Sequence, residues 1–518
     1  MPGPGRPDAL DHVVVVMFEN RSFDNLLGCL YEPGEVAAFD GVRGKGLSNP
    51  VPAWAEHRGG VVPYGVAQTM DTPNPDSGEE YQHVNTQLFG LIDPAGNRAA
   101  LAEHMVAPYN APEDGRAPTM DGFVADYISA FWAETGREPS YDEYAQIMTG
   151  YTPQQMPVVS ALARGFATFD HWFAEVPTQT FANRSFMHAA TSSGLVVNAP
   201  YANFPLHNAA TTVFERLESA GLSWRVYVDP PSRIPFTGLI HAPRLRARFA
   251  SHFATTDRFL EDAAEGKLPT YSFIEPNLWH GHNDMHPPIS ALVPGAAFDA
   301  PSSLLGGEAL LAKIYNAVRT ASSPDGSNCF NTLLMVTFDE HGGTYDHVPP
   351  PAATPPEPAR PPGQLGFVFD RLGVRVPAIA ISAWIPQRTV VTDVHHHTSV
   401  IQTLRQRWNL GAPLTARDAT APGLATVLSR DEPRAPEDWP DVLPRPVPEF
   451  RESLVPVGAP LSPLAKALFQ GYLALTKQLG QAVPDIPGDA ELSGGQALDI
   501  VHETAGDLFP GLRMATSR

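Results

Sequence analysis

The fold of this chain is decided by the stretch Val13-Val14-Val15-Val16-Met17-Phe18-Glu19-Asn20. An unbroken apolar run of this kind is typical of a strand buried on both faces, as in a parallel sheet. Glu19 and Asn20 follow at the carboxyl end of that strand, the edge where open α/β sheets bind their ligands. Their side-chain oxygens suit a hard cation. The simpler alternative is that the two residues begin a turn and cap a helix.

A second stretch repeats this pattern. Residues Thr332–Phe338 are largely apolar and are followed by Asp339 and Glu340, with two glycines shortly after. Two parallel strands that both end in oxygen ligands can converge on one ion, and the glycines allow the backbone to turn tightly beside it. We therefore predict one divalent metal ion, most readily Ca²⁺ or Mg²⁺, bound by Glu19, Asn20, Asp339 and Glu340.

The composition limits the possible partners. The chain of 518 residues has 35 basic and 56 acidic side chains, a net charge of −21, which disfavours nucleic acid as a partner. A phosphate substrate stays possible, because a bound cation reverses the local field. Cys29 and Cys329 are too few and too far apart for a disulfide framework or a zinc motif. They are expected to be buried free thiols.

The organisation along the chain predicts one large catalytic unit. We expect a catalytic domain over residues 1–430, with a loop insertion at about 31–120 that is rich in Gly, Pro and Asn. Residues 431–518 are expected to form a helical extension packed on the core. We find no transmembrane segment and no signal peptide, so a cytoplasmic location is expected, or a secreted one if a leader precedes the printed sequence. The oligomeric state stays open.

Several other side chains are candidates for the site. Thr180 lies in a polar turn, residues 176–184, before an expected small-residue helix at 185–193, and a helix N-terminus favours anions. The alternative is an ordinary threonine cap. His282 and His286 belong to a dense cluster of ligand-type residues on a loop. His83 can be a ligand, but its sequence context alone favours a surface histidine.

Five motifs, in order, resemble the phosphoesterase family that contains bacterial phospholipases C and acid phosphatases. They cover about residues 10–410 and are Glu19–Asp24, Thr180–Arg184, Asn283–Pro288, Phe338–Gly343 with Tyr345–Val348, and His397–Val400. The resemblance implies an α/β fold with three α/β/α layers and a central, mostly parallel sheet, like that of alkaline phosphatase. A sulfatase is less expected, because no Cys or Ser stands in a Cys-x-Pro-x-Arg context.

The resemblance also implies roles for single residues. Thr180 would be the nucleophile, with its oxygen on the same metal ion. His286 would act on the phosphoryl group as a second catalytic residue. Further substrate contacts would come from four residues: His83, Asn183, His282 and His397. The family usually has proline where Ala182 stands. The missing proline is expected to loosen the turn around Thr180 and makes Thr178 a weak rival nucleophile.

These features predict a metal-dependent hydrolase of phosphoric esters that works through a phosphothreonine intermediate. The substrate would be a small phosphate ester, as for an acid phosphatase, or a phospholipid head group, as for a phospholipase C. The alternative is a non-catalytic protein that binds metal and phosphate in the same pocket without turnover.

Overall fold

The computed structural model describes residues 6–98, 105–112, 115–278, 281–288, 303–448, 463–481 and 494–513. Its centre is an eight-stranded sheet of order β13-β6-β12-β11-β1-β10-β8-β9. The strands are β1 (His12–Phe18), β6 (Ala167–Phe169), β8 (Trp224–Val228), β9 (Phe253–Thr255), β10 (Tyr271–Glu275), β11 (Thr332–Phe338), β12 (Ala378–Ile381) and β13 (Thr389–Val391). Only β12 runs antiparallel to its neighbours. The prediction of a mostly parallel sheet is therefore confirmed.

The register of the two central strands explains where the site lies. Strand β1 pairs in parallel with β11, and Phe18 stands opposite Phe338. The next residues, Glu19 and Asp339, therefore leave the sheet at the same level. The four valines of β1 are at most 1% exposed, as a strand covered on both faces requires.

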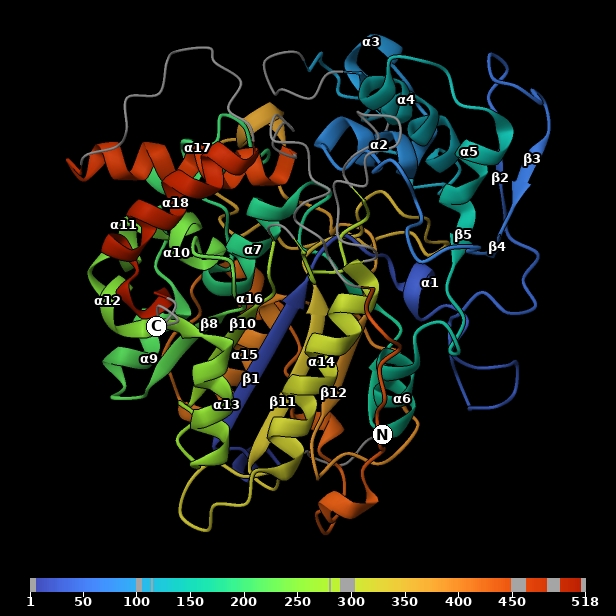
Figure 1. Cartoon of the computed structure of the whole chain (residues 1–518). Helices are drawn as coiled ribbons and strands as arrows, with labels where there is room; N and C mark the ends of the chain where they lie inside the picture. The colour runs from blue at the N-terminus through green and yellow to red at the C-terminus, as the bar shows by residue number, and fades with distance from the viewer. Residues whose placement is uncertain are drawn as a thin grey trace.

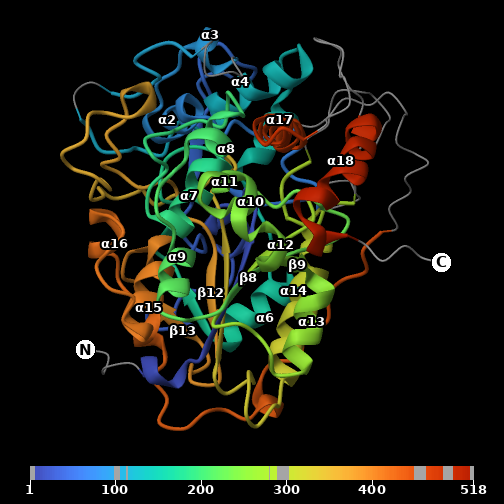
Figure 2. The ribbon, with the colours of Figure 1, turned by 90° about the vertical axis from the view of Figure 1, so that its left-hand side faces the viewer.

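Helices cover both faces of the sheet, which confirms the three-layer α/β/α architecture. One layer holds α6 (Pro157–Gly165), α13 (Thr256–Ala264) and α14 (Ser303–Thr320). The other holds α7 (Thr180–Ala189), α9 (Val213–Ser219) and α15 (Thr398–Trp408). Figure 2 shows the two layers on opposite sides of the strands, with α13 and α14 at the right and α9 and α15 at the left.

A second, smaller hydrophobic cluster lies above the carboxyl ends of the strands. It contains buried side chains of α2 (Tyr81–Phe89), α4 (Phe123–Thr135) and α5 (Tyr141–Ala145). Short elements of the same region are α1 (Phe23–Leu26), α3 (Pro94–Asn97) and the two-stranded pairs β2 (Ser48–Pro50) with β3 (Val61–Pro63) and β4 (Gly65–Val66) with β5 (Thr149–Gly150). Figure 1 shows these elements on the right, with α2, α3 and α4 at the top and α1 at mid-height.

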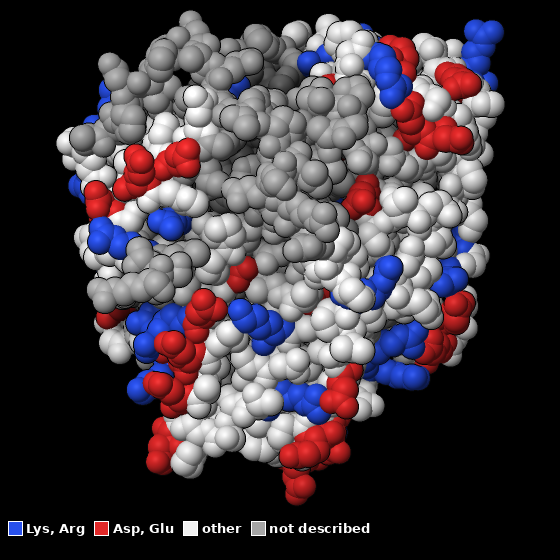
Figure 3. Space-filling model, in the orientation of Figure 1, with Lys and Arg blue, Asp and Glu red and all other residues white. Residues whose placement is uncertain are grey.

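The C-terminal helices α17 (Pro463–Gln478) and α18 (Gly494–Leu508) lie at the upper left of Figure 1. Their buried side chains Leu468, Tyr472 and Val501 belong to the main hydrophobic cluster. The domain boundary at residue 430 stays a prediction. Within the described part of the chain, no helix combines the length and the hydropathy needed to cross a lipid bilayer. On the face shown in Figure 3, acidic and basic side chains are interspersed.

Candidate active site at the carboxyl ends of the central strands

Four of the predicted metal ligands meet where β1 and β11 end. The side chains of Glu19, Asn20, Asp339 and Glu340 are fully buried. The backbone N–H groups of Asn20 and Glu340 both donate to Asp339 Oδ1, at 3.2 and 2.8 Å. Burial, and secondarily the charge of Asp339, raise the pKa of Glu340 well above its usual range. The structure therefore concentrates oxygen ligands and negative charge in one buried place, as the two sequence stretches predict.

Thr180 faces this cluster. Its Oγ1 donates to Glu19 Oε2 at 3.3 Å, and the residue is fully buried. Helix α7 begins at Thr180 itself, so the expected start at residue 185 was five residues late. Thr178 points elsewhere, because its hydroxyl donates to the Val196 carbonyl at 2.9 Å. Of the two threonines, only Thr180 directs its hydroxyl at a predicted metal ligand.

Asn183 holds the turn that precedes Thr180. Its Nδ2 donates to the carbonyls of Thr178 and Gln179, at 2.7 and 3.1 Å, and its Oδ1 accepts from the Val176 backbone N–H at 3.1 Å. These bonds fasten the turn although alanine stands at position 182. In the structure Asn183 therefore acts on the backbone around Thr180, and its predicted contact with a phosphoryl group stays a prediction.

Arg184 is a site residue to which sequence reasoning gave no role. It lies one helical turn after Thr180, is 2% exposed, and forms an ion pair with Glu19. Its Nε is 3.5 Å from Asp339 Oδ2. Burial lowers the pKa of Arg184, but Glu19 and Asp339 outweigh this and raise it. The spacing of four residues from Thr180 was the signal that could have identified it, since residues i and i+4 share a helix face.

The donor set passes a physical test for a metal ion. Among the described residues, three buried oxygens of the cluster accept no hydrogen bond from the protein: Asn20 Oδ1, Asp339 Oδ2 and Glu340 Oε1. A buried acceptor without a partner costs about 1–3 kcal/mol. A divalent cation with oxygen preference would satisfy all three, so the residues present fit such an ion.

Two acidic residues from the insertion complete the cluster on the other side of Asn20. Asn20 Nδ2 donates to Glu79 and lies 2.9 Å from His286 Nε2. His286 Nε2 is in turn 3.7 Å from Asp76 Oδ2. Potential cation ligands of Asp76, Glu79 and His286 lie within 4.8 Å of one another. Burial is the main cause that raises the pKa of Asp76 and of Glu79.

Sequence reasoning missed Asp76 and Glu79 as site residues. They lie in a segment without periodic structure, just before α2. The one available signal was the run Glu79-Glu80-Tyr81-Gln82-His83, in which two carboxylates precede a histidine.

The remaining predicted histidines contact the periphery of the cluster. His282 Nδ1 is 2.8 Å from Asp284 Oδ1, and the Asp284 carbonyl accepts from the Glu19 backbone N–H at 2.8 Å. His397 Nε2 is 2.7 Å from the Asp339 carbonyl oxygen. Both histidines therefore adjoin the strand ends that carry the ligands. Their predicted contacts with substrate stay predictions.

His83 is buried and faces Asp126. The distance from His83 Nδ1 to Asp126 Oδ1 is 2.7 Å, and Nε2 lies 3.8 Å from Glu80 Oε2. Burial lowers the pKa of His83, but Asp126 outweighs it and the pKa is raised to about 9. The surface alternative is therefore wrong, because His83 is only 4% exposed. Its predicted contact with substrate is untested.

Another cluster of ligand-type residues, Asp24, Asp346 and His347, already holds a positive charge. Arg375 Nη2 is 2.9 Å from Asp24 Oδ1, and its Nε is 2.8 Å from Asp346 Oδ1. All three charged side chains are fully buried. A guanidinium therefore neutralises the two carboxylates, and this cluster is no candidate for the catalytic cation.

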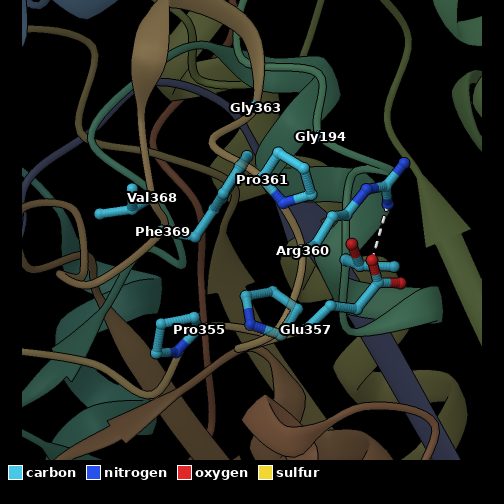
Figure 4. Close-up of a pocket in the computed structure, with 10 residues that line it drawn as sticks. Gly194, Pro355, Glu357, Arg360, Pro361, Gly363, Val368 and Phe369 are labelled. Carbon is cyan, nitrogen blue, oxygen red and sulfur yellow. Dashed lines mark hydrogen bonds and ion pairs between the residues drawn. The ribbon is translucent and has the colours of Figure 1, made fainter.

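The pocket in Figure 4 is also no substrate site. It lies between Gly194 and the loop that carries Pro355 and Pro361, and its volume is about 30 Å³. That space holds one or two water molecules. The one cation that lines it, Arg360, is paired with Glu357 at 2.7 Å. A phosphate ester is larger than this space, and the paired Arg360 leaves no unneutralised positive charge among the described lining residues to bind it.

A buried hydroxyl beside an acidic cluster, at the carboxyl edge of a mostly parallel sheet, defines the class of this protein: an α/β protein equipped for hydrolytic chemistry. The model of the Phosphoesterase family matches residues 10–411, and the chain belongs to this family. It is 33% identical to non-specific phospholipase C1 of Arabidopsis thaliana over 86% of this chain and 75% of that protein.

A bacterial relative is similar over the same length. Phospholipase C B of Mycobacterium tuberculosis is 26% identical over 84% of this chain and 80% of that protein. Among solved structures, a phosphonate monoester hydrolase of Agrobacterium radiobacter matches 55% of this chain and 74% of that chain, with 15% identity and a TM-score of 0.30. Family and relatives together identify this protein as a phosphoric ester hydrolase.

Proposed function

We propose that the protein is a metal-dependent phosphoesterase of the phospholipase C type, which hydrolyses the phosphate ester of a phospholipid head group. The relatives with the highest identities given above carry the name phospholipase C, which supports this substrate class over a small phosphomonoester. The observation that carries the chemistry is the contact between Thr180 Oγ1 and Glu19 Oε2, inside a cluster of oxygen ligands that lack hydrogen-bond donors.

The metal ion would be held by Glu19, Asn20, Thr180, Asp339 and Glu340. When bound there, a divalent cation supplies charge that lowers the pKa of a neighbouring hydroxyl and neutralises phosphoryl oxygens. The oxygen-only ligand set favours Ca²⁺ or Mg²⁺.

The chain's own residues perform the displacement. Thr180 Oγ1 attacks phosphorus, and the ester bond to the leaving oxygen breaks on the opposite side, which gives a phosphothreonine. The hydroxyl proton passes to Glu19, whose Oε2 already accepts the Thr180 hydrogen bond. The N-terminus of α7 directs its positive end at the phosphoryl oxygens. The leaving oxygen takes a proton from solvent. Water then attacks phosphorus, the bond from phosphorus to Thr180 Oγ1 breaks, and the proton held by Glu19 returns to Oγ1, which restores Thr180.

His286 is proposed to stabilise charge on the phosphoryl group. Its Nδ1 is 2.8 Å from the Pro287 carbonyl, so Nδ1 carries the proton and Nε2 is an acceptor facing Asn20. To donate to a phosphoryl oxygen, His286 would have to gain a proton at Nε2, after which Nε2 no longer accepts from Asn20 as it does without substrate. Burial, the largest cause, lowers the pKa of His286.

A substrate screen tests this function. A phosphocholine lipid, a chromogenic phosphodiester, a chromogenic phosphomonoester and a sulfate ester are offered to the protein before and after treatment with a chelator. We expect the lipid and the phosphodiester to be hydrolysed fastest, with loss on chelation and recovery on adding Ca²⁺ or Mg²⁺. Tight metal binding without turnover of any substrate would favour the non-catalytic alternative.

A further inference from the structure

The side-chain amide of Asn20 is held from one side only. Its Nδ2 donates to the Glu79 carboxylate and lies 2.9 Å from His286 Nε2, so both amide hydrogens have acceptors. Its Oδ1 accepts nothing from the described residues, although Asn20 is fully buried. The amide therefore has a satisfied side, which faces the insertion, and an unsatisfied oxygen on the side away from Glu79.

The two acceptors determine which way the amide points. The Glu79 carboxyl oxygen accepts the hydrogen bond from Asn20 Nδ2, and a histidine that donates from Nδ1 presents a lone pair at Nε2. His286 Nδ1 faces the Pro287 carbonyl at 2.8 Å, which makes Nε2 the acceptor. If the amide rotated by half a turn, Oδ1 would face two acceptors and Nδ2 would occupy the position of the metal-binding oxygen. Both consequences are unfavourable.

Glu79 can act in this way because its loop is fastened to the strand end that carries the other ligands. The Ser77 hydroxyl donates to the Gly342 carbonyl. A Cβ atom on Gly343 would lie 2.6 Å from the Gly78 carbonyl, so only glycine allows this approach. Gln87 of α2 donates to the same carbonyl at 2.7 Å. The loop around Glu79 and the loop after β11 therefore pack as one unit.

Asn20 itself has a left-handed backbone conformation that its surroundings maintain. Its φ of +56° lies in the left-handed region, which few residues other than glycine adopt. Gly342 approaches so closely that an added Cβ atom would lie 2.5 Å from Asn20 Cβ. The backbone position of Asn20 is thus set by the strand ends, whereas the rotation of its amide is set by Glu79 and His286.

We propose that Glu79 is a positioning residue that, together with His286, holds the Asn20 amide with Oδ1 facing the metal site. In this role Glu79 acts through Asn20, and the double-mutant cycle below distinguishes this from direct binding of the cation by Glu79. The inference rests on the proposed function, because it presumes that a cation binds to Glu19, Asn20, Asp339 and Glu340. Outer residues of this kind change metal affinity by about 10–100-fold when they are replaced.

The test measures Mn²⁺ affinity by calorimetry, in the full chain and without substrate. We expect Glu79→Ala to weaken binding by about 10–100-fold. Glu79→Gln should stay within about threefold of wild type, because the new side-chain oxygen still accepts from Asn20. If Glu79→Ala does not fold, Glu79→Met, which keeps the length without an acceptor, takes its place. Glu134→Gln is the control. Glu134 is a neighbouring acidic residue, and its pKa is raised by burial and, secondarily, by the charge of Glu80.

A double-mutant cycle shows whether Glu79 acts through Asn20. In an Asn20→Ala background the amide is gone, so adding Glu79→Ala should change the Mn²⁺ affinity by less than about twofold. An undiminished effect in that background would show a direct action on the cation and overturn the inference. Equal damage by Glu79→Gln and Glu79→Ala would also overturn it, as would wild-type affinity of Glu79→Ala. A wild-type protein that binds no divalent ion would overturn the proposed metal dependence as well.

Discussion

Replacing Thr180 by valine removes the proposed nucleophile and keeps the shape of the side chain. In the structure this deletes one buried hydrogen bond, to Glu19 Oε2, which contributes about 1 kcal/mol to stability. The N-cap of α7 is Gln179, so no cap is lost and the variant should fold. Turnover should nevertheless fall at least about a thousandfold, or roughly 4 kcal/mol of activation barrier, because the covalent route disappears.

The assay follows hydrolysis of a chromogenic phosphodiester at saturating concentration, and acid quenching of the reaction tests for phosphate bound to the protein. Thr180→Ser should keep partial activity, since the oxygen remains. Thr178→Val is the matched control, because the Thr178 hydroxyl donates to the Val196 carbonyl and not to the cluster. We expect it to cost stability, on the order of 1 kcal/mol, with turnover largely kept.

Two results would refute this reasoning. If Thr178→Val abolished turnover while Thr180→Val did not, the nucleophile would be the other threonine. If neither substitution mattered in an active enzyme, water would attack phosphorus directly and no phosphothreonine would form.

Four further predictions follow from particular contacts. Elemental analysis should find a divalent metal in the purified protein, and a metal-free protein whose activity ignores chelators would contradict us. Arg184→Met should lower the free energy of unfolding by about 3–5 kcal/mol in a denaturant titration, because it leaves Glu19 buried without its ion pair. Truncation before residue 463 should lower the melting temperature and leave kcat unchanged, since α17 and α18 supply core packing; a folded variant without turnover would count against this. Burial lowers the pKa of His347, but Asp24 and Asp40 raise it overall to about 9. Its stabilising charge is therefore complete below about pH 6.5 and lost as the pH rises through about 9, which urea unfolding at several pH values would detect.

The central part of the fold could be predicted because its signal is local. A strand buried on both faces must be apolar throughout, so β1 and β11 stand out in the sequence, and β11 has the predicted limits of 332 and 338. Parallel pairing then brings the residues after both strands together. The contact between Asn20 and Asp339 across the strand ends is the direct consequence.

The start of α7 could not be predicted in the same way. Its first turn contains Thr180 and Asn183, polar residues that favour turns when nothing else acts on them. In the folded chain the Asn183 side chain binds backbone groups of Val176, Thr178 and Gln179 in the preceding, non-helical turn. Asparagine side chains usually compete with helix formation, but the Asn183 side chain fastens the turn that precedes α7. This role depends on tertiary packing.

The outer residues of the site are hidden from sequence reasoning for a different reason. Asp76 and Glu79 belong to an irregular segment, and Glu79 reaches Asn20 while Asp76 reaches His286 because Ser77 and Gly78 pack on the glycines after β11. Likewise, a histidine can be recognised as a candidate, but its partner cannot. His83 faces Asp126, and His397 faces the Asp339 carbonyl, both through contacts that no motif encodes.

The charge balance of the site links folding to function. The carboxylates of Glu19, Asp339, Glu340, Glu79 and Asp76 are gathered in one cluster, whereas Arg184 is the guanidinium that pairs with Glu19 and Asp339. Gathering like charges away from water opposes folding unless opposite charge joins them. A cation that binds only the folded chain would relieve this repulsion and stabilise the protein by mass action. The gathered carboxylates that destabilise the metal-free protein are thus the same groups that give the cation its affinity. The Asn20 amide, held on the side of Glu79, directs its oxygen at the position of that cation.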